Sequence, residues 1–138
     1  MPRKALKIGI MSREDSKKRT IAIVKGEYKP HKDEPKVWFE SLQSLAQVLS
    51  DENRVLLKVI EEQKPKSIKA LEEITGRKSS NLSRTLHTMA SYGIVDLLKQ
   101  RTKELIPIAK ATRFTIDLDP SLKFKKRDSA PTHVRVAH

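Results

Sequence analysis

Residues 79–95 read SSNLSRTLHTMASYGIV, and this stretch decides how the rest of the chain is interpreted. Leu82, Leu86 and Met89 follow one another at intervals of four and three residues, so an α-helix would place them on one face. Gly93 follows this stripe, and glycine is typical of the position that ends a helix. The pattern predicts a helix over about residues 79–92 with one buried face and one polar face.

A shorter helix is expected just before this one. Ser67 can cap its start, and Gly76 can end it. Its expected core face consists of Ile68, Leu71 and Ile74. Two helices separated by only a few residues around Arg77 and Lys78 have the spacing of a helix-turn-helix motif.

Two further helices are predicted upstream. The first spans about residues 40–49, and the second is capped by Ser50 and runs to about residue 62. The expected core face of the second helix consists of Val55, Leu56, Val59 and Ile60. Trp38 and Phe39 precede both helices and are expected to anchor the core, with contact to a dimer partner as the alternative.

The hydrophobic period changes after Gly93 from helical to extended. Residues 94–100 and 105–108 are apolar stretches separated by a polar tip at 101–104, which predicts a β-hairpin wing. Residues 114–118 alternate apolar and polar side chains, which predicts one more strand. The expected fold is therefore mainly α with a small β wing, an α+β winged helix-turn-helix domain over residues 37–118.

The two ends are expected to lie outside this domain. Residues 1–36 are interpreted as an N-terminal extension and a candidate for dimerisation or partner binding, and residues 119–138 as a basic, flexible tail. Ser12 and Asp15 resemble a capping box for a helix over about 13–25 that places Ile21, Val24 and Tyr28 on one face. Residues 20–24 also fit a strand, so both readings stay open, and residues 29–36 read as a linker.

The positive charge of the chain is concentrated in blocks. The sequence has 29 Lys and Arg against 17 Asp and Glu, a net charge of +12. Residues 1–36 and residues 77–113 each carry +6, whereas residues 37–76 carry −2. The second basic block coincides with the predicted second helix and wing, which favours a polyanionic partner such as nucleic acid.

Several function classes are disfavoured by what the sequence lacks. It has no cysteine, hence no disulfide, zinc–cysteine cluster or thiol nucleophile. His31, His87, His133 and His138 are scattered, and no Gly-rich phosphate loop or acidic metal-ligand motif is present. We expect no catalytic residues, no cofactor and no metal. Without a signal-like segment or an apolar run of membrane length, a cytoplasmic protein that does not contact a membrane is expected.

The stretch from residue 79 to 95 resembles the recognition helix and the start of the wing in MarR/ArsR-like winged-helix regulators. The likeness extends upstream to residues 49–57 and downstream to residues 112–118. Together these segments are similar to a prokaryotic group of DNA-binding proteins, some of which serve as antitoxins beside a small toxin gene. The resemblance implies a transcriptional regulator, a repressor in particular, that binds double-stranded DNA as a homodimer.

In such motifs the second helix enters the major groove, so the residues around its start are the candidate DNA contacts. On this helix Asn81 suits adenine and Arg84 suits guanine, while serine hydroxyls suit phosphates or adaptable base contacts. The helix contributes Ser79, Ser80, Asn81, Ser83, Arg84 and His87. Lys66, Arg77 and Lys78 would flank the DNA backbone, and Lys99, Arg101 and Lys103 would let the wing reach a phosphate or the minor groove.

Three binding functions remain open at this point. The first is a sequence-specific repressor, and the second is an autoregulating antitoxin that also binds a toxin protein through residues 1–36 or the tail after Pro120. The third is a basic RNA-binding protein that uses the same fold. RNA binding lacks its usual mark, because no aromatic residues alternate with the basic ones for base stacking.

Overall fold

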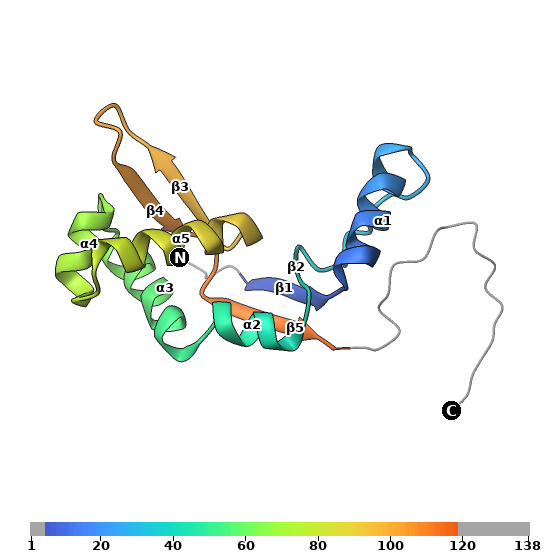
Figure 1. The fold of residues 1–138 in the computed structure, drawn as a ribbon, viewed down its shortest axis with the longest axis horizontal. Helices are drawn as coiled ribbons and strands as arrows, with labels where there is room; N and C mark the ends of the chain where they lie inside the picture. The colour runs from blue at the N-terminus through green and yellow to red at the C-terminus, as the bar shows by residue number, and fades with distance from the viewer. Residues whose placement is uncertain (1–4, 119–138) are drawn as a thin grey trace.

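The computed structural model describes residues 5–118 and contains five helices and five strands within that range (Figure 1). The basic tail predicted at 119–138 lies outside the described residues. The helices are α1 (Arg13–Val24), α2 (Leu42–Val48), α3 (Asp51–Gln63), α4 (Ile68–Thr75) and α5 (Ser79–Tyr92). The strands are β1 (Ala5–Ile10), β2 (Val37–Phe39), β3 (Val95–Lys99), β4 (Leu105–Ala109) and β5 (Arg113–Asp117). Within residues 5–118 no helix combines the length and apolar character that crossing a membrane needs.

Helices α3, α4 and α5 form the predicted helix-turn-helix core. Ser50 and Ser67 cap α3 and α4 as expected, each accepting a hydrogen bond from a backbone N–H three residues later. Gly76 and Gly93 end α4 and α5 with positive φ angles, which a glycine adopts without strain. Leu82, Leu86 and Met89 are fully buried, so the face of α5 predicted from its spacing is confirmed.

The wing is an antiparallel hairpin of β3 and β4. Leu97 lies opposite Pro107, and the tip contains Lys103 with a φ of 71°. Val95 at its base is buried in the same core as Leu86. The α+β winged helix-turn-helix fold is therefore confirmed.

The remaining strands form a sheet whose pairing the sequence did not indicate. Its order is β2-β1-β5, and both pairings are parallel. The strand predicted over residues 114–118 is present as β5, whereas no strand is predicted from the sequence over residues 5–10, where β1 lies. In Figure 1 the sheet lies between the winged helix-turn-helix core on one side and α1 on the other.

The central position of β1 bears on how the chain is divided. Ile8 of β1 is fully buried in the same cluster as the core residues of α3 and α5. The predicted boundary after residue 36 falls immediately before β2 and so separates it from β1, with which it pairs. The independence of residues 1–36 stays a prediction, although β1 shares a sheet and a core with the rest of the chain.

Residues 13–24 are helical, so of the two readings of this segment the helix holds and the strand does not. Its single buried residue is Ala22, whereas Ile21 is 45% exposed and Val24 is 80% exposed. The apolar face predicted there is thus a surface. The helix is held instead by Arg19, whose guanidinium lies 5.4 Å from the ring of Trp38 and 2.6 Å from the carboxylate of Glu34.

Two members of the predicted core faces are on the surface instead. Val55 is 62% exposed and Ile74 is 40% exposed, while Leu57 is fully buried. For Val55 the reason is that α3 packs against β4, which turns the buried face of α3 toward Leu57. Phe39 is fully buried and stacks on Tyr92 with ring centroids 4.2 Å apart, joining the parallel sheet to the end of α5.

Candidate nucleic-acid interface

The exposed face of α5 is polar and cationic. Leu82 and Leu86 point into the core, and helical spacing places Ser80, Arg84 and His87 on the opposite side. All three are exposed, as is Asn81 beside them. Helix α5 contains no acidic residue, whereas α3 and α4 both do. The helix therefore contributes no carboxylate of its own that would repel a polyanion.

The amino-terminal end of α5 differs from the other helix starts. Among the five helices within residues 5–118, only α5 has an N-cap side chain that accepts no hydrogen bond from its first turn, because Lys78 occupies this position. The other four are capped by Ser12, Ser41, Ser50 and Ser67. Backbone N–H groups of the first turn and the exposed Lys78 therefore form one positive end, which suits an anion.

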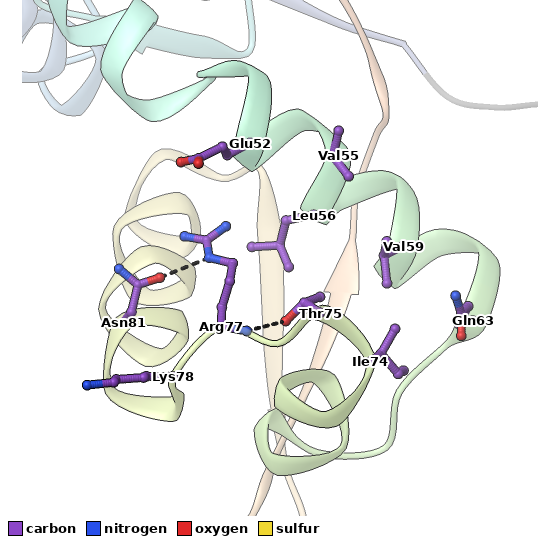
Figure 2. A pocket seen from close by; sticks show the side chains of 10 residues that line it. All are labelled: Glu52, Val55, Leu56, Val59, Gln63, Ile74, Thr75, Arg77, Lys78 and Asn81. Atoms are coloured by element: carbon purple, nitrogen blue, oxygen red, sulfur yellow. Dashed lines mark hydrogen bonds between the residues drawn. The ribbon is translucent and has the colours of Figure 1, made fainter.

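Arg77, predicted as a DNA-flanking residue, is half-buried and bonded within the protein. Its Nε donates to Oδ1 of Asn81 at 2.9 Å, and its Nη1 donates to Oδ1 of Asn53 at 3.1 Å. Nη2 donates to the Thr85 hydroxyl at 3.3 Å, and the backbone N–H donates to the Thr75 hydroxyl at 3.2 Å. Figure 2 shows this side chain between α5 and α3, whereas Lys78 points away from α3.

Ser79 and Ser83 are also engaged internally. The Ser79 hydroxyl donates to Glu72 of α4, so it ties the two helices of the motif together. Ser83 is half-buried, and its carbonyl oxygen lies 2.8 Å from Nδ1 of His87. With the proton on Nδ1, Nε2 of the exposed His87 is left as an acceptor.

The wing and the loop before α4 meet through one hydrogen bond. Nε2 of Gln100 donates to the carbonyl oxygen of Lys66 at 3.0 Å. The exposed Lys66 is thereby placed beside the start of the wing tip, where Lys99, Arg101 and Lys103 are exposed as well. The hydrogen bond thus brings Lys66 beside a wing whose basic residues Lys99, Arg101 and Lys103 follow it by more than thirty positions in the sequence.

Asn53, Thr85 and Gln100 were missed by the sequence interpretation. Asn53 lies in the first turn of α3, and its Nδ2 donates to the carbonyl oxygen of Val48 at 3.0 Å while its Oδ1 accepts from Arg77. An asparagine three residues after a serine cap is common in the first turn of a helix. The sequence therefore gave no indication of its contact with Arg77.

A groove of about 820 Å³ lies beside this network, between α3 and the turn that joins α4 to α5 (Figure 2). Val55, Val59 and Ile74 give it an apolar side, and Arg77 and Asn81 close one end. Val55 and Ile74, which were predicted to lie in the core, both line this groove. Within residues 5–118 no group of His, Cys, Asp or Glu side chains is arranged to hold a metal ion.

The HVO_A0114 family matches residues 48–116, which is half of the chain. The chain belongs to the HVO_A0114 family. The matched residues run from the last residue of α2 to Ile116, the next-to-last residue of β5. They therefore contain the helix-turn-helix core and the wing. The likeness to MarR/ArsR-like regulators concerns the same segment and stays a resemblance.

Other comparisons add little to the HVO_A0114 family assignment. One solved structure, described as the predicted DNA-binding transcriptional regulator from E. coli, has 21% sequence identity and a TM-score of 0.42. The similarity covers 50% of this chain and 73% of that one. None of the curated proteins matches the sequence.

Proposed function

We propose that this HVO_A0114 family protein is a transcriptional regulator that binds double-stranded DNA by placing α5 in the major groove. The observation that carries the proposal is the exposed face of α5, with Ser80, Arg84 and His87 in a row and no carboxylate on the helix. The major groove of B-DNA is wide enough for an α-helix and displays a distinct hydrogen-bonding pattern for each base pair. A polar helix face presented by a helix-turn-helix motif is suited to read that pattern.

Arg84 and Asn81 are the proposed base-reading residues. Arg84 is exposed, and a guanidinium pairs with two acceptors of guanine. Oδ1 of Asn81 already accepts from Arg77, so the amide nitrogen is the atom that donates to a base acceptor. Ser80, Ser83 and His87 supply adaptable contacts to bases or phosphates.

Arg77 and Ser79 receive a supporting role in this proposal. Arg77 orients Asn81 and joins α5 to α3, and Ser79 joins α5 to α4. Lys78, together with the first-turn N–H groups of α5, binds a phosphate. Division of this kind between positioning and contacting residues is expected, because a recognition helix needs a fixed orientation to read bases.

The wing supplies contacts that do not depend on sequence. Lys66, Lys99, Arg101 and Lys103 are exposed on the hairpin and the loop bonded to it. Lysine and arginine at such positions neutralise phosphates and release condensed counterions, which makes binding dependent on salt. We therefore assign them to the phosphate backbone or the minor groove.

The resemblance to MarR/ArsR-like regulators suggests two more specific roles, a repressor and an antitoxin. A cytoplasmic repressor that acts as a homodimer would place two α5 helices on half-sites about 34 Å apart, one turn of the duplex. The antitoxin role additionally requires a toxin protein as partner. Co-expression with the product of the neighbouring gene tests it, since an antitoxin forms a complex with that product and restores growth.

RNA binding is the outcome that would overturn this proposal. The deep, narrow major groove of an A-form duplex does not admit a helix, and the exposed face of α5 has no Phe, Tyr or Trp for stacking on single-stranded bases. Fluorescence anisotropy with the duplex upstream of the protein's own gene, a scrambled duplex and a structured RNA is the test. At physiological salt we expect the affinity to be highest for the protein's own duplex, lower for the scrambled duplex and lowest for the RNA. Tighter binding of the RNA than of the duplexes would contradict the proposal.

A further inference from the structure

Strand β5 lies at an edge of the parallel sheet. Within the described part of the chain it pairs with β1 on one side, and no strand covers its other side. It is five residues long, and Ile116 is 45% exposed, followed by Leu118 at 53%. A sheet of parallel strands is normally covered, and proteins usually protect an edge that combines unpaired backbone groups with apolar side chains.

The other edge strand of this sheet is better protected. Strand β2 has only three residues, and Val37 and Phe39 are buried. Trp38 between them is covered by the guanidinium of Arg19. Among the strands of residues 5–118, the contrast singles out β5 as the edge that is open to another strand.

The sequence of β5 is complementary to itself in the antiparallel sense. Its five residues are Arg113, Phe114, Thr115, Ile116 and Asp117. When two copies pair about a two-fold axis at Thr115, each Arg113 lies opposite Asp117 of the second copy, and each Phe114 lies opposite Ile116. Opposite charges and aromatic with β-branched side chains are among the favourable cross-strand pairs.

A shifted register loses this match. Two-fold symmetry allows only shifts of two residues, because hydrogen-bonded and non-hydrogen-bonded pairs alternate along an antiparallel ladder. Moving the axis to Phe114 places Arg113 opposite Thr115 and leaves Asp117 without the arginine. The two-fold axis at Thr115 is therefore the register that the side chains favour.

We propose that β5 pairs with β5 of a second copy of this chain, so that two three-stranded sheets join into one continuous six-stranded sheet. The interface is isologous, since the same strand serves both copies. It differs from the N-terminal segment expected from the sequence, whose strand β1 is enclosed between β2 and β5. The proposal concerns self-association and not DNA contact, so its failure leaves the proposed function standing.

Charge reversal tests the register. Arg113→Asp or Asp117→Arg alone creates two like-charge pairs across the interface, and we expect each to raise the dimer dissociation constant roughly tenfold or more. The double variant restores opposite charges and is expected to dimerise like the wild type. Sedimentation velocity of the full chain at several concentrations measures this, with circular dichroism to confirm that each variant is folded.

Cysteine cross-linking gives a second measurement, because the sequence has no cysteine of its own. In the Thr115→Cys variant the two cysteines lie opposite each other, at the Cα separation of about 4.5–5.5 Å found in antiparallel pairs, which a disulfide can bridge. Thr102→Cys at the exposed wing tip is the matched control, and Val24→Cys on α1 reports contact through the N-terminal segment.

We expect rapid oxidation to a covalent dimer for Thr115→Cys and slow oxidation for both other variants. A chain that stays monomeric at about 100 μM, or Thr115→Cys cross-linking no faster than Thr102→Cys, overturns the proposal. Preferential cross-linking of Val24→Cys overturns it as well, because the dimer contact then lies on α1. DNA affinity of the same variants at low protein concentration is measured separately, so loss of DNA binding is distinguished from loss of dimerisation.

Discussion

The Nε atom of Arg77 donates a hydrogen bond to Oδ1 of Asn81 across one turn at the start of α5. The same guanidinium reaches Asn53 on α3 and Thr85 further along α5. One side chain therefore fixes the orientation of the proposed recognition helix against α3. Removal of the Arg77 side chain should therefore lower the stability of the fold. Removal of the exposed side chain of its neighbour Lys78 should affect only DNA binding.

Replacing Arg77 by alanine is expected to lower the free energy of unfolding by about 1–3 kcal/mol, because Asn53 and Asn81 lose a charged donor. Arg77→Lys should recover only part of this loss, since an ammonium cannot reproduce the planar fork. Urea denaturation measures both variants. Lys78→Ala is the control and should stay within about 0.5 kcal/mol of the wild type, and equal effects at 77 and 78 would contradict the assigned roles.

Arg84 and Lys103 should separate base reading from phosphate contact. Arg84→Ala is expected to weaken binding to the cognate duplex by about 1–3 kcal/mol and to relax the preference for it. Lys103→Ala should weaken all duplexes alike and flatten the dependence of affinity on salt, because one phosphate contact is lost. Anisotropy titrations at two salt concentrations distinguish these outcomes. An Arg84→Ala variant that binds the cognate duplex like the wild type would show that α5 does not read the bases as proposed.

Much of the fold was accessible from the sequence because its signals are local. The apolar stripe of α5, the serine caps at Ser50 and Ser67 and the glycine stops at Gly76 and Gly93 each act within a few residues. These patterns set the helix boundaries to within one or two residues. The hairpin likewise depends on a nearby change of period.

The sheet and the Arg77 network were not accessible in this way. Strand β1 pairs with β5 more than one hundred residues later. The periodicity within a strand does not indicate which other strand it pairs with. Likewise, the bond between Arg77 and Asn53 joins residues 24 apart. A basic residue before a recognition helix gives the same pattern whether it faces DNA or the protein, so the site prediction named Arg77 without its structural role.

Substitutions at Leu57 and Val55 test which face of α3 is buried, because the sequence predicts Val55 in the core and the structure places Leu57 there. Leu57→Ala is expected to cost about 2–5 kcal/mol of stability, since a fully buried leucine leaves a cavity. Val55→Ala should change stability by less than about 0.5 kcal/mol, because its side chain is largely exposed. Thermal or urea unfolding of the two variants decides between the observed face and the predicted one. The reverse ranking would show that α3 is rotated relative to the structure.

Gly9 is required by its contact with Trp38 across the β1–β2 pairing. These two residues are register partners, and a Cβ atom at Gly9 would lie 2.5 Å from the ring of Trp38 and 2.8 Å from Pro35. The ring has little freedom to move, because Arg19 packs against it and is itself held by Glu34. Gly9→Ala should therefore destabilise the fold by about 1–3 kcal/mol through overpacking.

Most of the loss of stability should come from the contact with the Trp38 ring. In a Trp38→Leu background the added methyl group has more room, so the effect of Gly9→Ala is expected to fall by at least half in a double-mutant cycle. The measurement is urea unfolding of the two single variants and the double variant. Strict additivity of the two substitutions would mean that the Gly9 backbone or the contact with Pro35, and not the space occupied by Trp38, is what requires glycine at this position.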